Sequence, residues 1–164
     1  EGLYYNGGQL QDKTVINPVT WWILKNKGIP VLGEELNITV DRMDLLSYVS
    51  ENMNTYWANR IRKIEDSDPL LLLPKEFLNE EIQWSILGIL RQYYTLREHD
   101  IISKLGAGEY ALKHVPEEWH HIINEAIQIR KGTGKTFFES EKKRLDTASL
   151  FMEYILKEST IRDI

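Results

Sequence analysis

The stretch from Gln83 to Pro116 decides the fold, and it reads QWSILGILRQYYTLREHDIISKLGAGEYALKHVP. Apolar residues cover most of the helix circumference in its first half: Trp84, Ile86, Leu87, Ile89, Leu90, Tyr93, Tyr94 and Leu96. A helix with this pattern is buried on more than one side. Gly88 in its middle costs about 1 kcal/mol relative to alanine, and we expect a neighbouring helix to approach closely there as compensation. The stretch therefore predicts a central helix with several helical neighbours.

Further helices are predicted at short intervals around this stretch. The first covers 79–97, Ser103 can cap a second over 104–114, and Pro116 opens a third because proline suits the first helical position. A fourth covers 140–157. Short connections favour antiparallel neighbours, so residues 79–157 are predicted to form an antiparallel four-helix bundle. The fold class is mainly α.

A longer helix is expected upstream of the bundle, over 41–63, with Asp41 as its cap. Its last turns carry Arg60, whose positive charge complements the helix dipole together with its basic neighbours. One stripe at helical spacing is apolar: Leu46, Val49, Met53, Tyr56, Trp57 and Ile61.

A small α+β segment is expected to precede these helices. Asn17 and Pro18 favour a helix start, and Gly28 favours its end. Residues 3–5 and 29–32 are candidate short strands that could pair. We therefore divide the chain into a segment over 1–40 and a helical domain over 41–164.

Composition narrows the classes of function. The 164 residues suffice for one domain, or for a small piece joined to a larger one. A net charge of -5 argues against nucleic-acid binding, and it suits a cationic ligand as well as an ordinary cytoplasmic protein. No cysteine is present, which excludes disulfides and thiolate metal sites. No apolar run approaches the ~20 residues of a membrane span. The chain begins with Glu rather than Met, so we expect it to be processed or part of a longer protein.

Three motifs fail on inspection, and no metal or catalytic residues are predicted from them. The loop 132–136 ends like a phosphate-binding loop, but Ile129 stands where that motif needs glycine. The Asp-Ser-Asp sequence at 66–68 lacks the preceding Gly-Ser turn of nucleotide-transfer enzymes and is interpreted as a solvated turn. His121 and Glu125 share a helix face without an obvious third ligand, so an ordinary side-chain pair is favoured.

The helix pattern resembles a known family once the motif residues are placed. The motif runs through Ile101-Ile102-Ser103-Lys104, Ala107, Tyr110-Ala111-Leu112 and Val115-Pro116, with support from Leu87, Arg91, Tyr94, Glu125-Ala126 and Gly132. It resembles the C-terminal helical domain of bacterial aminoglycoside nucleotidyltransferases, the streptomycin/spectinomycin adenylyltransferase group. Residues 17–33 resemble the tail of that family's nucleotidyltransferase domain.

The resemblance implies roles for Lys104 and Glu81, and it draws attention to two positions, Arg130 and Trp84, where this chain departs from the family. Lys104 matches the lysine that reaches the nucleotide phosphates, and Arg130 stands where relatives have a tyrosine near the nucleotide. Glu81 matches an acidic position that contacts the drug, and a carboxylate suits ammonium groups. Trp84 stands where relatives are polar; it could line the ligand cleft, although core packing is the favoured alternative. The tryptophan and aspartate with which relatives hold streptomycin are replaced by Leu72 and Phe77, which speaks against streptomycin itself.

The resemblance also implies the wider reaction. ATP and Mg²⁺ would act in a longer parent protein, whose upstream domain supplies a Gly-Ser turn, two magnesium-binding aspartates and a glutamate base. None of these has a match here, so this chain alone is not expected to be catalytic. The expected function is to bind substrate and nucleotide during adenylyl transfer to a hydroxyl of an aminoglycoside-like cation. The alternative is a non-catalytic helical interaction or ligand-binding module.

Overall fold

The computed structural model describes residues 3–6, 8–11, 16–33, 37–66, 68–133 and 136–160. The chain forms two compact units, Glu1–Tyr48 and Val49–Ile164. Their boundary lies within helix α2 (Arg42–Asn52), and the division at residue 40 stays a prediction.

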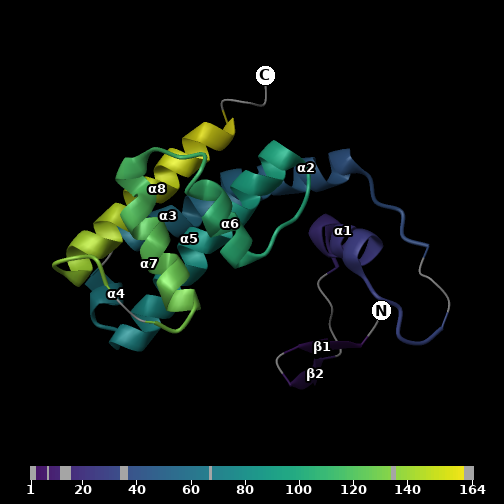
Figure 1. The fold of residues 1–164 in the computed structure, drawn as a ribbon, viewed down its shortest axis with the longest axis horizontal. Helices are drawn as coiled ribbons and strands as arrows, with labels where there is room; N and C mark the ends of the chain where they lie inside the picture. The colour runs from purple at the N-terminus through teal and green to yellow at the C-terminus, as the bar shows by residue number, and fades with distance from the viewer. Residues whose placement is uncertain are drawn as a thin grey trace. The chain divides into compact units, whose positions relative to one another are not determined.

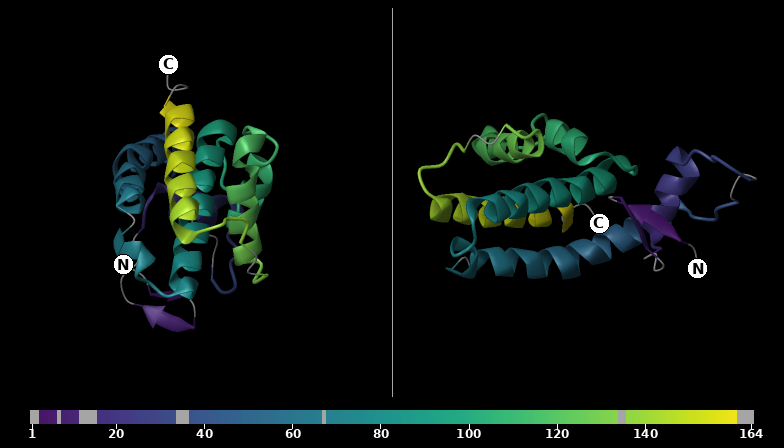
Figure 2. Two further views of the ribbon diagram at one scale, coloured as in Figure 1. Left: turned by 90° about the vertical axis from the view of Figure 1, so that its left-hand side faces the viewer. Right: turned by 90° about the horizontal axis from the view of Figure 1, so that it is seen from below.

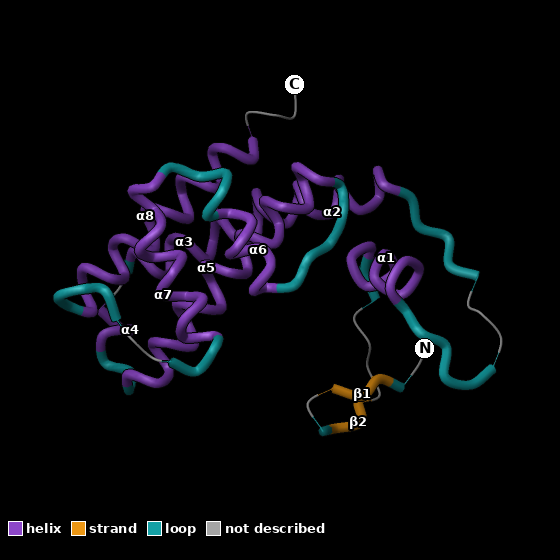
Figure 3. Tube along the Cα trace, in the orientation of Figure 1, coloured by secondary structure: helices purple, strands orange, loops and turns teal. Residues whose placement is uncertain are grey.

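Before the start of α2, the described part of the first unit forms a hairpin and a helix, coloured orange and purple in Figure 3. Strands β1 (Tyr4–Asn6) and β2 (Gln9–Gln11) are antiparallel, with Tyr5 opposite Leu10. The prediction of a strand over 29–32 is wrong, since Val31 and Leu32 are 90% and 95% exposed outside any strand. The tight turn at Gly8, with φ of 85°, lets β1 pair with the residues that follow it directly.

Helix α1 (Pro18–Lys27) confirms the predicted helix of this unit. The side chain of Asn17 accepts a hydrogen bond from the Thr20 amide at 3.0 Å, so that the predicted cap forms. At the other end the Gly28 amide donates to the Leu24 carbonyl at 3.1 Å. The cap residues therefore fixed both ends of α1 as the sequence predicts.

The helix predicted over 41–63 forms, but a π-helical turn interrupts it. Helix α2 (Arg42–Asn52) continues through η1 (Met53–Trp57) into α3 (Ala58–Glu65). Asp41 and Asp44 cap its start by exchanging hydrogen bonds with each other's amides at 2.8 and 3.2 Å. The wider i→i+5 turn shifts the register of the apolar stripe. Tyr56, predicted on the stripe, is consequently 42% exposed, while Trp57 next to it is 3% exposed.

The second unit is a packed set of helices, which confirms the mainly α fold class. After the short α4 (Asp68–Leu71) come α5 (Lys75–Glu98), α6 (Lys104–Ala111), the 3₁₀ turn η2 (Glu117–Trp119), α7 (His120–Arg130) and α8 (Glu141–Thr160). In the part of the chain that the structure describes, no helix is long and apolar enough to cross a membrane.

Helix α5 lies at the centre of this unit, as predicted. It packs against α6, α7 and α8, and α8 packs in turn against α3. Figures 1 and 2 show α5 and α8 between α3 on one side and α6 with α7 on the other. Eleven residues of α5 are buried, including Ile86, Leu87, Ile89 and Leu90 at 0% exposure, which confirms that its apolar surface faces several neighbours.

The close approach predicted at Gly88 is also present. A methyl group added at Gly88 would overlap the indole Cη2 of Trp57 and lie 3.0 Å from its Cζ2. Gly88 thus lets η1 seat its tryptophan against the backbone of α5. This contact places the aromatic residues of η1 beside the middle of α5.

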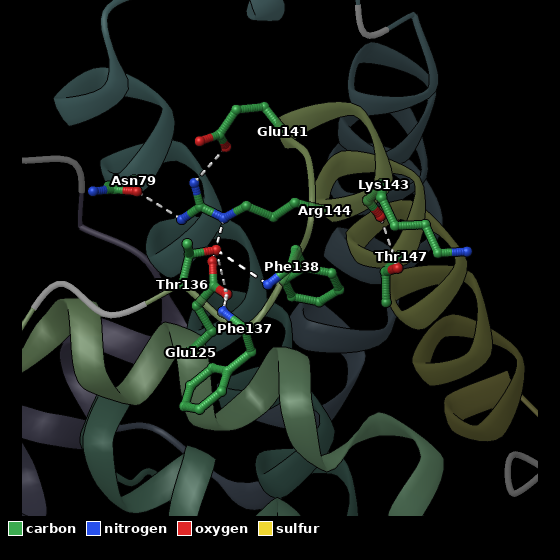
Figure 4. A network of polar contacts seen from close by, with 9 residues as sticks. All are labelled: Asn79, Glu125, Thr136, Phe137, Phe138, Glu141, Lys143, Arg144 and Thr147. Atoms are coloured by element: carbon green, nitrogen blue, oxygen red, sulfur yellow. Dashed lines mark hydrogen bonds and ion pairs between the residues drawn. The ribbon is translucent and has the colours of Figure 1, made fainter.

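A buried ion pair joins α7 to α8, as Figure 4 shows. Arg144 and Glu125 pair at 1% and 0% side-chain exposure. Arg144 also donates to Asn79 Oδ1 of α5 at 2.7 Å and to Glu141 Oε2 at 2.9 Å. The second oxygen of Glu125 accepts from the Phe137 amide at 2.8 Å. The network therefore fixes three helices and the loop before α8.

The structure describes parts of the three motifs that were rejected from the sequence. Glu125 pairs with Arg144, while the ring of His121 lies 5.1 Å from that of Phe138. The loop 132–136 and the turn 66–68 each include residues outside the described ranges. Gly132, which the structure does describe, follows α7 with φ of 77°, a conformation that favours glycine.

Candidate functional site

Trp84 is the centre of the candidate site, on the face of α5 that meets η1. Its indole stacks on that of Trp57 with ring centroids 5.5 Å apart and an angle of 29° between the planes. The ring of Tyr56 lies 6.0 Å away, edge-on. Trp84 is only partly buried. Part of its ring packs against the core, and the rest is accessible to side chains near the surface.

A cation from α3 reaches this tryptophan. The guanidinium carbon of Arg60 lies 4.4 Å from the ring centroid of Trp84, within the range of a cation–π interaction. Arg60 also forms an ion pair with Glu81 and donates from Nε to Ser85 Oγ at 3.2 Å. Ser85 donates in turn to Glu81 Oε1 at 3.1 Å. The predicted drug-binding carboxylate is therefore engaged by an arginine of the same chain.

A second cation near Trp84 is Lys104, at the first position of α6. The side chain of Ser103 caps this helix by accepting from the Gly106 amide at 3.0 Å. Arg91 of α5 donates from Nε to the Ile102 carbonyl at 3.0 Å and holds the preceding loop. These contacts place the Lys104 ammonium 5.2 Å from the ring centroid of Trp84.

The surroundings of Lys104 are positively charged. Burial lowers the pKa of Lys104 most, the charges of Arg130 and Arg91 lower it further, and Glu80 acts in the opposite direction. Burial also lowers the pKa of Arg91. An anion placed among these cations would relieve their mutual repulsion, and the N-terminus of α6 adds amides that favour negative charge. The arrangement can hold a phosphate group.

The structure brings the four predicted residues into one region. Trp84 and Lys104 are in contact range, Glu81 is one helical turn from Trp84 on α5, and Arg130 at the end of α7 lies close enough to act on the charge of Lys104. Their functional roles stay predictions. Leu72 and Phe77, at the positions tied to streptomycin in relatives, are 86% and 65% exposed.

Sequence reasoning missed Arg60. The sequence predicts only a favourable interaction of Arg60 with the helix dipole, yet the side chain contacts both Glu81 and Trp84. A signal was present, because Arg60 follows Trp57 by three residues and so shares its helix face. In the described residues no cluster of three or more His, Asp or Glu could hold a metal ion.

Comparison with known proteins identifies the region that carries this site. Residues 68–157, more than half of the chain, match the profile of a family described as the C-terminal domain of aminoglycoside adenylyltransferase. The match contains Glu81, Trp84, Lys104 and Arg130, whereas Arg60 lies before its first residue. No curated protein matches the chain.

Proposed function

Because the chain belongs to the family of the aminoglycoside adenylyltransferase C-terminal domain, we propose that it binds substrate and nucleotide in adenylyl transfer from ATP to an aminoglycoside hydroxyl. The observation that carries the proposal is the position of Lys104. This lysine is held at the start of α6, beside Trp84 and among the positive charges of Arg130 and Arg91. Such a cluster suits the triphosphate of ATP.

In this proposal Lys104, Arg130 and Arg91 have different roles, which follow from the shape and position of their side chains. Lys104 contributes an ammonium ion that can contact more than one phosphate oxygen, because its three donors rotate freely. Arg130 contributes a planar guanidinium, which can pair with a phosphate or stack on the adenine. Arg91 holds the loop before Lys104 through the Ile102 carbonyl and adds to the local positive charge.

The aminoglycoside would lie toward Glu81 and Trp84. A carboxylate beside an aromatic ring suits an organic cation, through charge-assisted hydrogen bonds and cation–π contact. A nucleotidyltransferase domain upstream in the full-length protein would supply the Mg²⁺ ligands and the base. Mg²⁺ would neutralise phosphate charge and orient the reacting groups during in-line attack of the hydroxyl on the α-phosphate.

Replacing Lys104 with alanine is expected to weaken ATP binding by about tenfold or more. A hydrogen bond to a charged group contributes about 1.5–3 kcal/mol, and about 1.4 kcal/mol corresponds to a factor of ten in affinity. The measurement is calorimetric titration of ATP into the full-length protein and its Lys104→Ala variant.

The matched control is Lys113→Ala, which removes an exposed lysine just after the same helix. This variant is expected to bind ATP within about twofold of wild type, since screening weakens distant surface charges. Equal ATP affinity in the Lys104→Ala and Lys113→Ala proteins would contradict the proposal. That result would instead favour the helical interaction module.

A second prediction concerns pH. The pKa of Lys104 is lowered in the free protein, and a bound phosphate would raise it again. ATP affinity is therefore constant below the free-protein pKa and falls as pH rises through the window between the two values. We expect this fall to begin below the ordinary lysine value of about 10.4, with proton uptake on binding in that window.

Titrations of ATP between neutral and alkaline pH, in two buffers of different ionisation enthalpy, measure both effects. Lys104→Arg is the control, because arginine stays charged throughout this range. It is expected to remove the alkaline fall in affinity and the proton uptake. A Lys104→Arg protein with the same alkaline fall as wild type would assign the titration to another group.

A further inference from the structure

Arg60 already contacts both groups that an organic cation would bind at this site, the Glu81 carboxylate and the Trp84 ring. Its guanidinium pairs with the Glu81 carboxylate and covers the ring of Trp84 at 4.4 Å from the centroid. Ser85 completes the arrangement, because its hydroxyl accepts from Arg60 Nε and donates to Glu81. The arginine is thus bound as a substrate cation would be, by a carboxylate, a hydroxyl and an aromatic face.

Burial and hydrogen bonds hold Arg60, Glu81 and Ser85 in place. The side chains of Arg60 and Glu81 are each 21% exposed, so that solvent only partly screens their attraction. Ser85 is fully buried, and its position one turn after Glu81 on α5 keeps the hydroxyl beside the carboxylate. A cation arriving from solvent must therefore compete with an arginine that is already partly buried and oriented.

We propose that Arg60 is an internal competitor for the substrate cation, which binds at Glu81 and Trp84 only when it displaces the arginine. This inference rests on the proposed function and adds a specificity-determining residue to it. A single weakly held amine gains too little to displace Arg60, whereas a polycation can offset the loss through its other contacts. Lys104 also lies near this ring, at 5.2 Å from its centroid, whereas the carboxylate of Glu81 pairs with Arg60.

A purely structural arginine would behave in the opposite way. If Arg60 served only to brace α3 against α5, its removal would loosen the site and weaken the binding of every ligand. A competitor, once removed, leaves the carboxylate and the ring to the substrate, so that affinity for the cation rises. The direction of the change in affinity therefore separates the two roles.

The experiment compares the full-length protein with its Arg60→Gln variant, using spectinomycin as an ammonium probe and streptomycin as a guanidinium probe. Arg60→Gln is expected to bind at least one of the two drugs about tenfold more tightly, with a much smaller change in ATP affinity. Arg60→Gln combined with Glu81→Gln is expected to lose that gain. The matched control is Arg62→Gln, on the exposed side of α3, which is expected to change neither affinity.

The outcomes separate this inference from the proposed function. Unchanged or weaker drug binding by Arg60→Gln, with Lys104-dependent ATP binding intact, overturns the inference and leaves the proposed function standing. A gain that persists without Glu81 also overturns it. Absence of drug binding and of Lys104-dependent ATP binding in wild type and variants overturns both.

Ser85→Ala provides a second test in case the Arg60 variant fails to fold. It removes the hydrogen bonds of the Ser85 hydroxyl to Arg60 and Glu81 and leaves only a small space where the oxygen was. Because Arg60 is then held less firmly, drug affinity is expected to rise two- to threefold with little change in thermal stability. A Ser85→Ala protein that binds neither drug more tightly than wild type overturns the inference.

Discussion

Replacing Arg144 with methionine is expected to destabilise the protein by about 3–5 kcal/mol, the cost of removing one partner from a buried ion pair. Methionine keeps most of the volume of the arginine stem but leaves the Glu125 carboxylate, at 0% exposure, without its cation. The Phe137 amide still donates to Glu125, yet a neutral donor cannot replace a full positive charge. Asn79 and Glu141 lose a hydrogen-bond partner as well.

Urea unfolding followed by circular dichroism measures this loss, and two further variants interpret it. Lys142→Met removes a cation from the same helix, where Lys142 pairs with Asp146 at 53% and 46% exposure. It is expected to cost less than about 1 kcal/mol, as exposed pairs do. Arg144→Met combined with Glu125→Leu is expected to be more stable than Arg144→Met alone, because the double variant buries no unpaired charge. If the two proteins are equally stable, burial of the charge is not the cause.

The ion pair also shows where sequence reasoning could have gone further. Glu125 lies among Ile122, Ala126 and their apolar neighbours on the core face of α7, and Arg144 precedes Ala148 by one turn on the core face of α8. Each position alone indicates a charge directed into the core. Their pairing could not be predicted, because it depends on how α7 and α8 pack, and sequence spacing gave only His121 as a neighbour of Glu125.

Helix positions and the centrality of α5 were predictable because they depend on local caps and apolar periodicity, as the Asn17 and Ser103 caps show. The π-helical turn was not, since one extra residue in a turn leaves no clear sequence signal. It precedes α3 directly, and it therefore affects how Trp57 and Arg60 are directed toward Glu81 and Trp84 of α5. Lys104 could be singled out from the family motif in the sequence. The pairing of Arg60 with Glu81 could not be predicted, because it depends on tertiary packing.

Gly88→Ala is expected to destabilise the protein by about 1–2 kcal/mol, although alanine has a higher helix propensity than glycine. Alanine gains about 1 kcal/mol over glycine within a helix, but its methyl group would overlap the indole of Trp57. Overpacking of a filled core costs about 1–3 kcal/mol, occasionally more. Trp57→Ala alone is expected to cost about 3–5 kcal/mol, because it empties the space of a buried aromatic side chain.

The double variant gives the sharper test, because the sign of the Gly88→Ala effect should reverse. Once Trp57→Ala removes the indole, the added methyl group meets open space and its helix propensity stabilises the protein by up to about 1 kcal/mol. Urea unfolding of the four proteins in this cycle measures the coupling between the two positions. Additive effects would mean that Trp57 and Gly88 do not compete for the same space. Because Trp57 also stacks on Trp84, Gly88→Ala should also perturb the ring that Arg60 and Lys104 share. A residue without a side chain thus affects the geometry of the candidate site.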